Sequence, residues 1–531
     1  MRSKILRKKI VIGVAAAMML SLAACGKDSD QDKTTATTTI SAVEDTSQDI
    51  MVQTDDTSEQ ISTDDITETG TDETSTDDNS GKTDTADDTN ETGTQAEAGN
   101  ENIPVKENIA INDTISDDSD GGHAILADGE TAEYSNIKVE KTGEADGDEA
   151  DFYGENAAVF ATNGATLTLS NIVVETDGKH ANGVFSYGEG TTVNISDSVI
   201  ETTGNCSGGL MTTGGGTTNA TNLYIHTTGN SSAAIRSDRG GGTVNVTSGE
   251  YITDGKGSPV IYSTADITVN DAVMTSTSSQ GVVVEGKNSV TLNNVTLTAD
   301  NNSKNSDKSS YYQAVMIYQS MSGDAAEGDA SFTMNGGTLT NKNGDIFFVN
   351  NTVADINLSG AEIVNLDTEG VFLRAAAAGW GNEGSNGGKV NMNASSQEIN
   401  GDIKVDSVSK LNLYLSDSSS FNGTINPDGQ EADVYVEIRG GSKWVLTGDS
   451  YITSLTCDAD SIDLNGHKLY VNGEEYTSGT ASTGEKLTLS SGSGSSGSGN
   501  GGSGSSDRPD APPDGNGNGD DNGEPPAKPG E

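Results

Sequence analysis

The strongest constraint on the fold is a short apolar motif that returns about every 25 residues. Its central residues are Val159, Val184, Leu210, Ile235 and Ile261, so successive copies are 25, 26, 25 and 26 residues apart. Self-similarity at a fixed period of this length is typical of a solenoid, in which each repeat adds one unit to a stack. We therefore expect a repeat architecture.

Two further runs of alternating apolar residues follow each motif. The second run contains pairs such as Val193 and Ile195, and the third contains segments such as Val199 to Thr202. Alternation at period two indicates strands with one face in a core and one in solvent. Three strands per repeat, without helical periodicity, predict an all-β parallel β-helix over Val105 to Lys486, of roughly fourteen coils about 4.8 Å apart. A propeller is the alternative, but its blades need four strands and about 40 residues.

Two stretches break the period, from Asp300 to Tyr312 and from Ser322 to Asp329. A solenoid accommodates extra residues at the turns between strands, where they do not disturb the stacking. We expect both stretches to project from the coils as loops.

The N-terminus has the layout of an export signal. A basic start with Arg2, Lys4, Arg7, Lys8 and Lys9 precedes an uncharged apolar run to Ala24, which is shorter than the roughly 20 residues of a membrane span. The segment Leu22 to Gly26 resembles the lipobox of bacterial lipoproteins, which implies cleavage before Cys25 and lipidation of its thiol. Two acyl chains give stable anchoring. We expect a lipoprotein held to the outer face of the cell membrane through Cys25, rather than an ordinary secreted protein with a chance cysteine.

Polar, low-complexity tails flank the repeats. Residues 25–104 are rich in Thr, Asp and Ser, and residues 487–531 are rich in Gly, Ser, Pro and Asp. Segments with so few apolar residues cannot bury enough surface to fold. We expect a disordered tether, long enough to cross a cell wall, and a disordered tail.

The formal net charge of −52 limits the partners. Nucleic acids and anionic lipid surfaces both require clustered Lys and Arg, so we expect neither as a partner. Solubility explains the charge, with Ca²⁺ capture by surface carboxylates as the alternative. The two cysteines besides Cys25, Cys206 and Cys457, are expected to be buried without forming a disulfide framework, in a monomer that needs no cofactor.

Several segments of the repeat region look like those of known β-helix proteins. Phe152 to Ala158, Asn182 to Gly188, Ala233 to Asn245 and Met316 to Gly323 resemble the pectate-lyase-like right-handed parallel β-helix superfamily, particularly adhesin-like surface lipoproteins of Gram-positive gut bacteria. Trp444 to Ser450 is similar to coils of autotransporter passenger domains. The resemblance implies a right-handed coil and display at the cell surface, and it implies little about activity.

Motifs for catalysis are absent from the sequence, and the four histidines lack the spacing of zinc ligands. Aligning the repeated motifs instead predicts one outward row that could bind a saccharide, because aromatic rings stack on sugars and an arginine fork matches a uronate carboxylate. The row consists of Phe160, Phe185, Met211, Arg236, Tyr262, Glu285, Tyr318 and Arg374, with Tyr187, Asp238, Arg239 and Lys287 beside it. In the alternative interpretation, a loop covers Phe160, Phe185 and Met211, while Arg236 and Glu285 only pair along a solvated face.

The function predicted from this row is non-catalytic binding of extracellular polysaccharide, host glycan or protein. Enzymes of the resembled superfamily that cleave acidic polysaccharides use an Arg or Lys base with Ca²⁺, which would assign Arg236 or Arg239 as the base and Asp238, Asp266 and Glu285 as ligands. A glycosidase carboxylate pair and a purely structural spacer remain further alternatives.

Overall fold

The structure is a computed structural model that describes residues 103–304 and 306–490. The predicted signal peptide, Cys25, nearly all of the tether and the tail beyond residue 490 lie outside the described residues. No helix in the described ranges is long and apolar enough to cross a membrane.

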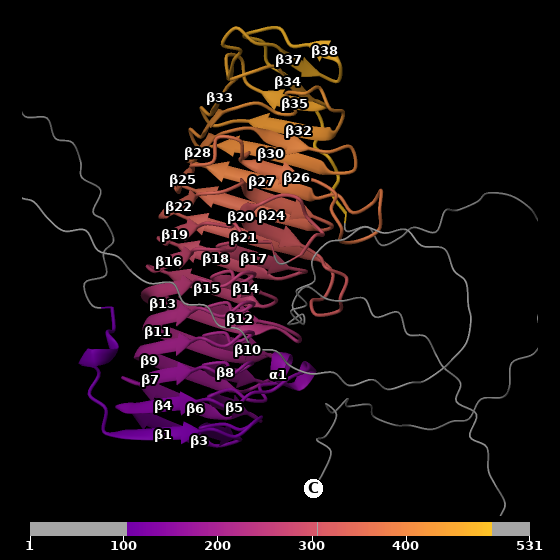
Figure 1. The fold of residues 1–531 in the computed structure, drawn as a ribbon. Coiled ribbons are helices and arrows are strands. Elements are labelled where there is room, and N and C mark those ends of the chain that lie inside the picture. Colours follow the sequence, from indigo (N-terminus) through magenta and orange to yellow (C-terminus); the bar gives the residue numbers. More distant parts are fainter. Residues whose placement is uncertain (1–102, 305, 491–531) are drawn as a thin grey trace, which may run out of the picture. The chain divides into compact units, whose positions relative to one another are not determined.

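The described chain is a parallel β-solenoid whose strands stack coil upon coil from β1 and β3 to β37 and β38 (Figure 1). One side of every coil up to β29 belongs to an 11-stranded parallel sheet. Its strands are β2 (Ile125–Asp128), β5 (Val159–Thr162), β8 (Val184–Tyr187), β10 (Leu210–Thr213), β12 (Ile235–Ser237), β14 (Ile261–Ser263), β17 (Val282–Glu285), β20 (Gln313–Tyr318), β23 (Asp345–Asn350), β26 (Leu373–Ala375) and β29 (Ile403–Val405).

The other two sides form a 20-stranded sheet, because long strands such as β9, β11 and β13 run on around the corner between them. Its strands are β1 (Asp113–Asp117), β3 (Thr131–Ser135), β4 (Ile137–Lys141), β6 (Thr166–Ser170), β7 (Val173–Thr176), β9 (Thr192–Thr202), β11 (Gly216–Thr227), β13 (Gly242–Thr253), β15 (Asp266–Asn270), β16 (Val273–Ser276), β18 (Ser289–Asn293), β19 (Thr296–Ala299), β21 (Asp329–Asn335), β22 (Thr338–Asn341), β24 (Val353–Ser359), β25 (Glu362–Asn365), β27 (Lys389–Ser395), β30 (Lys410–Ser416), β32 (Asp433–Ile438) and β35 (Ser454–Cys457).

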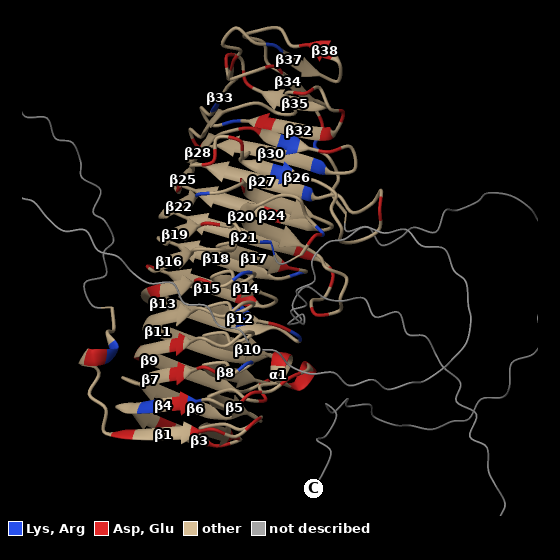
Figure 2. Ribbon diagram, viewed as in Figure 1, with Lys and Arg blue, Asp and Glu red and all other residues tan. Residues whose placement is uncertain are grey.

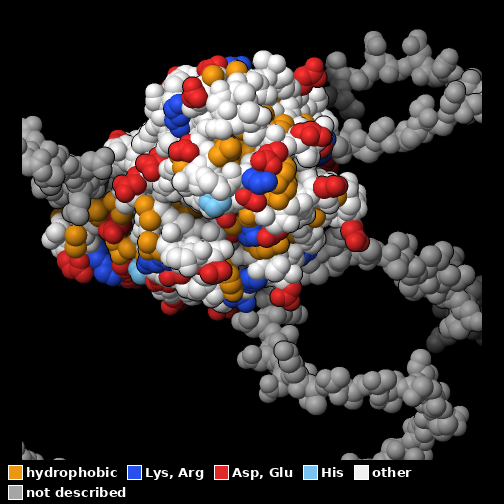
Figure 3. All heavy atoms as spheres, turned by 90° about the horizontal axis from the view of Figure 1, so that it is seen from above, with side chains coloured by type: hydrophobic (Ala, Val, Ile, Leu, Met, Phe, Trp, Pro, Cys, Tyr) orange, Lys and Arg blue, Asp and Glu red, His pale blue; other side chains and the backbone are white. Residues whose placement is uncertain are grey.

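Two small sheets complete the C-terminal coils. The first sheet contains β28 (Glu398–Asn400), β31 (Ser420–Asn422), β33 (Lys443–Val445) and β36 (Ile462–Asp463). The second contains β34 (Ser450–Ile452), β37 (Leu469–Val471) and β38 (Glu474–Glu475). The view onto this end in Figure 3 shows hydrophobic side chains in small groups separated by polar and acidic ones. The antiparallel pair β37–β38 closes the stack.

The predicted register is confirmed for the repeated motif. Val159, Val184, Leu210, Ile235 and Ile261 are consecutive ladder partners and point into one continuous core. The fold class is therefore the expected all-β parallel β-helix, in which the longer strands such as β27 and β30 each place three side chains in the core. Cys457 is a buried free thiol within that core.

One corner of the solenoid requires glycine. Gly143, Gly178, Gly204, Gly229 and Gly255 stack on one another, and a Cβ on Gly229 would lie 1.9 Å from the backbone oxygen of Gly204. Buried serines use the same carbonyls: the hydroxyl of Ser232 donates to Gly204 O at 3.1 Å. We call this stack the glycine corner.

Irregular segments interrupt the coils beside the 11-stranded sheet. The loops expected after Asp300 and Ser322 are confirmed, since residues 300–312 and 319–328 lie between strands. Two further insertions were not predicted, the short helix α1 (Asp148–Phe152) and the loop at residues 376–388. A 3-10 turn, η1 (Lys106–Asn108), precedes β1. Charged residues in these segments and at the turns are mainly acidic (Figure 2).

Candidate functional site

The predicted row lies on the outward face of the 11-stranded sheet, with one error of register. Tyr262 pairs with Val283, which pairs with Met316, whereas Glu285 pairs with Tyr318. Glu285 and Tyr318 therefore lie two residues further along their strands than predicted. A shift of two residues keeps the same facing, so both side chains still point outward.

Most of the row is covered, contrary to the expectation of an exposed stripe. Arg236 is only 3% exposed, Glu285 1% and Tyr318 2%. Phe160, Phe185 and Met211 form a buried cluster with Tyr187.

The cover over that cluster is α1 and the residue after it. The Tyr153 ring lies edge-on to Tyr187 at 5.8 Å, and the Phe152 carbonyl accepts a hydrogen bond from Thr213 Oγ1 at 2.7 Å. The alternative interpretation is thus confirmed for these residues, because a short insertion buries them.

The arginines of the row are already paired with carboxylates of the same chain. Arg236 donates to Asp238 at 2.8 Å, and Arg374 donates to Asp345 at 2.6 Å. Arg239 donates to Asp324 at 2.8 Å and to Asp148 of α1 at 2.9 Å. Lys287 is exposed at the turn after β17.

These ion pairs make Arg236 and Arg239 unsuitable as catalytic bases. Burial lowers the pKa of Arg236 and of Arg239, but the adjoining carboxylates outweigh it and raise both pKa values overall. An arginine base needs a lowered pKa. Neither arginine has the environment that the lyase hypothesis requires.

The acidic residues considered for Ca²⁺ do not form one ligand set. Asp238 is fully buried against Arg236, and burial raises its pKa to about 7. Asp266 lies on the 20-stranded sheet and accepts a hydrogen bond from Ser289 at 2.8 Å. Glu285 is bound by two tyrosines.

Tyr262, Glu285 and Tyr318 form a buried hydrogen-bonded group. Both tyrosine hydroxyls donate to Glu285 Oε2, that of Tyr318 at 2.9 Å, and the two hydroxyl oxygens lie 3.1 Å apart. Burial raises the pKa of both tyrosines well above the ordinary value, and it also raises the pKa of Glu285. Both hydroxyls lie within donor distance of Glu285, and the contact between the two oxygens also allows one hydroxyl to donate to the other.

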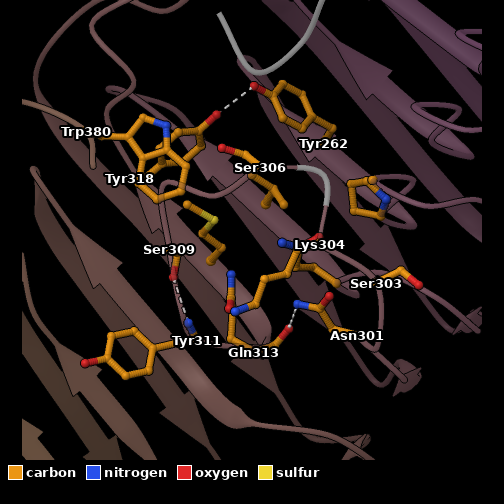
Figure 4. A pocket seen from close by; sticks show the side chains of 15 residues that line it. Tyr262, Asn301, Ser303, Lys304, Ser306, Ser309, Tyr311, Gln313, Tyr318 and Trp380 are labelled. Carbon is orange, nitrogen blue, oxygen red and sulfur yellow. Dashed lines mark hydrogen bonds between the residues drawn. The ribbon is translucent and has the colours of Figure 1, made fainter. Parts of the chain in front are cut away.

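A pocket opens in front of these tyrosines (Figure 4). Its aromatic walls are Tyr262, Tyr311, Tyr318 and Trp380, and Met316 lies between them. The cavity volume is about 80 Å³, room for about two or three water molecules at the roughly 30 Å³ that one water occupies in the liquid. The cavity can therefore enclose a hydroxyl group or one edge of a sugar, while the rest of the ring stays outside it.

The surrounding loops position the aromatic walls. The indole of Trp380 packs edge-on against Tyr318 at 5.2 Å, and its loop is joined to the 300–312 loop by a hydrogen bond from Gly379 N to Lys308 O at 2.7 Å. The guanidinium of Arg374 lies over the Tyr311 ring at 4.1 Å. Arg374 thus supports a wall of the pocket.

Two polar atoms in the pocket wall lack a partner within the described part of the chain. Gln313 Oε1 and Trp380 Nε1 make no hydrogen bond, although their residues are only 2% and 3% exposed. Buried polar groups normally have a partner, which a water or a ligand in the pocket could supply to these two atoms. Together with the tyrosine oxygens, they add hydrogen-bonding groups to a lining that also contains Lys304, Asn301, Gln280 and three serines.

A second buried group consists of Asp151, His180 and Cys206, whose potential ligand atoms lie within 4.8 Å of one another. No sequence pattern pointed to this group, since the helix that carries Asp151 was not predicted. Cys206 already has an interaction of its own, so we do not assign a metal to this group.

Sequence reasoning found Tyr262 and Tyr318 but missed Gln313, Lys304, Tyr311 and Trp380. Trp380 is one of two tryptophans in the chain and stands in a Gly- and Asn-rich stretch, which was an available signal. Comparison of the chain with protein-family models, curated proteins and solved structures found no match.

Proposed function

We propose that this protein is a cell-surface module that binds an extracellular saccharide in the pocket formed by Tyr262, Tyr311, Tyr318 and Trp380. The observation that carries the proposal is the combination of these four rings with the unpartnered atoms of Gln313 and Trp380. Aromatic walls with a few fixed polar groups are typical of small-ligand sites. Sugar rings present apolar faces to such walls and hydroxyls to such polar groups.

Surface display is part of the proposal and rests on the sequence. The export signal and the lipobox at Cys25 support an anchor at the membrane. The acidic tether would hold the solenoid away from the membrane, where extracellular glycans are accessible.

The test is retention of the purified full chain on a panel of immobilised polysaccharides and mucin glycans. We expect retention that Trp380→Ala abolishes and that Tyr414→Ala, a change on the 20-stranded sheet, leaves intact. Retention unaffected by Trp380→Ala would place the site elsewhere, and no retention on any glycan would refute saccharide binding.

Cleavage of a saccharide is a second candidate, favoured by the raised pKa of Glu285, which binds the pocket residues Tyr262 and Tyr318. A carboxyl group whose pKa is raised is suited to act as a general acid. Chromatography of the incubated glycans separates the two functions, because new reducing ends or unsaturated products indicate an enzyme.

A further inference from the structure

The last described segment of the chain, residues 484–490, lies on the outward face of the 20-stranded sheet and is held there through its main chain. Gly484 exchanges two hydrogen bonds with the hydroxyl of Thr456 on β35, at 3.0 and 3.1 Å. Leu487 N donates to Asn412 Oδ1, and Asn412 Nδ2 donates to Leu487 O, both at 3.0 Å. Because β30 and β35 are two coils apart, three residues cover about 10 Å, the rise of an extended strand. This face therefore already binds one extended polypeptide.

Asn412 is the end of a line of outward asparagines that runs through every coil from β9 to β30, strands that are stacked one on the next in Figure 1. Each member lies beside the one in the neighbouring coil, either directly or displaced by two residues. We call the following residues the asparagine line: Asn194, Asn219, Asn245, Asn270, Asn293, Asn335, Asn357, Asn391, Asn393 and Asn412. Asn412 is only 2% exposed beneath the segment 484–490, whereas every other member is half-buried or exposed.

Members inside the line keep hydrogen-bonding groups that could meet a ligand. Asn293 donates to Asn270 Oδ1 at 2.9 Å and accepts a hydrogen bond from Asn335 at 2.9 Å. A side-chain amide has two N–H groups and an oxygen with two lone pairs, so one donor and one acceptor of Asn293 remain after its bonds within the described chain. Asn412 uses the same two groups to hold Leu487. An extended polypeptide presents a matching N–H and C=O at every second residue along one edge.

The contacts of segment 484–490 also indicate what kind of polypeptide fits. A Cβ on Gly484 would lie 2.8 Å from the backbone oxygen of Leu455, so a chain that approaches this closely needs glycine at such points. Asp266 and Asp355 project from the same face beside the line, and the whole chain carries a formal charge of −52. An acidic partner is repelled by such a surface. The face therefore fits a neutral chain with small side chains.

We propose that the asparagine line binds a neutral, glycine- and serine-rich polypeptide of another protein in extended form, and that it recognises the main chain of that polypeptide. The surface is continuous with the interface of segment 484–490, which supplies the mode of binding. It lies on a different sheet from the pocket, so polypeptide binding does not depend on the proposed saccharide site.

A labelled peptide of alternating glycine and serine, about 12 residues long, provides the test, because it spans about 40 Å when extended, the length of eight coil spacings. Fluorescence anisotropy with the full chain should show saturable binding. The same peptide with sarcosine in place of glycine lacks every second main-chain N–H and should bind at least about tenfold more weakly. Equal binding of the two peptides, or no binding of either, would overturn the proposal. So would loss of peptide binding in Trp380→Ala, or an oligomer of N-acetylglucosamine that binds the line when the peptide does not.

Two matched pairs of substitutions connect the binding to the line. Asn219→Thr combined with Asn293→Thr removes two interior members, and threonine already stands on this face at Thr291, so the strands are retained. We expect the affinity for the glycine–serine peptide to fall by about tenfold or more. Asn400→Thr combined with Asn422→Thr breaks a similar contact of 2.9 Å on β28 and β31 and should leave the affinity unchanged. Equal effects of the two pairs, with circular dichroism showing both proteins folded, would contradict the assignment of the surface.

Discussion

Replacing a single glycine of the glycine corner should separate two coils of the solenoid. In Gly229→Ala, the new Cβ would lie 1.9 Å from Gly204 O, about 1 Å inside the 3.0 Å limit that real contacts respect. Both atoms are fixed to backbone, so no side-chain rotation relieves the overlap. The coils must move apart by about 1 Å, which is incompatible with inter-strand hydrogen bonds near 2.9 Å.

The energetic cost follows from the bonds at this corner. The displaced Gly204 carbonyl accepts from Ser232 Oγ at 3.1 Å, and the Ser232 amide donates to Ser258 Oγ at 2.9 Å. Leaving two buried partners unsatisfied costs about 1 to 3 kcal/mol each. We expect the free energy of unfolding to fall by about 3 to 5 kcal/mol, a large part of the typical 5 to 15 kcal/mol of a folded domain.

Urea denaturation followed by circular dichroism measures this change, and hydrogen exchange at residues 228–232 reports it locally. The matched control is Gly164→Ala, where nothing lies within 4 Å but φ is +77°. That variant carries backbone strain alone, about 1 to 2 kcal/mol. Equal effects of the two substitutions, or a Gly229→Ala protein as stable as the wild type, would refute the steric argument.

Three further predictions concern other parts of the chain. Asn156 is fully buried and makes three hydrogen bonds to backbone groups. Asn156→Ala should therefore lower the free energy of unfolding, measured in urea, by about 3 kcal/mol or more. A change in that free energy no larger than the experimental error would contradict the prediction. Burial raises the pKa of Asp238 from 3.8 to about 7. Between these two pH values the folded protein keeps a proton that the unfolded chain releases. The free energy of unfolding should therefore fall as pH rises from about 4 to 7, by on the order of 1 kcal/mol per pH unit. Asp238→Asn should remove this part of the slope in pH-resolved denaturation, and an unchanged slope would show that Asp238 does not titrate in this range. Cys25→Ala should release the protein from the membrane fraction in a detergent partition assay, and continued membrane association would argue against the lipid anchor.

The period-two and 25-residue patterns were sufficient to predict the fold. Inward residues such as Val184 and Leu210 recur in register because each must fill the same position in the next coil, and this requirement is visible in sequence. The outward face of the sheet was predicted for the same reason.

What covers that face could not be predicted. Insertions such as α1 carry no periodic signal, and their contacts join residues far apart: Arg239 meets Asp324 and Asp148, which are 85 and 91 positions away in sequence. From the sequence, the row of charged and aromatic residues was therefore predicted to be an exposed stripe. In the structure, most of these residues form internal pairs beneath loops. The pocket arises where two of those loops meet strands of the 11-stranded sheet, so Tyr262, Met316 and Tyr318 belong to the repeat whereas Tyr311 and Trp380 belong to the loops.

The position of η1 has a mechanical consequence. Strands β1, β2 and β3 are hydrogen-bonded to the next coil on one side only within the described chain, so tension along the stack would unzip this end one coil at a time. Lys106 of η1, however, binds Glu175 at 3.1 Å and Glu201 at 2.7 Å, on strands further into the stack. A pull on the entering chain is therefore borne first by this ionic clip, and β1 carries load only after the clip opens. Because both carboxylates are partly exposed, the clip weakens with salt, so ionic strength affects the tension at which load passes to β1.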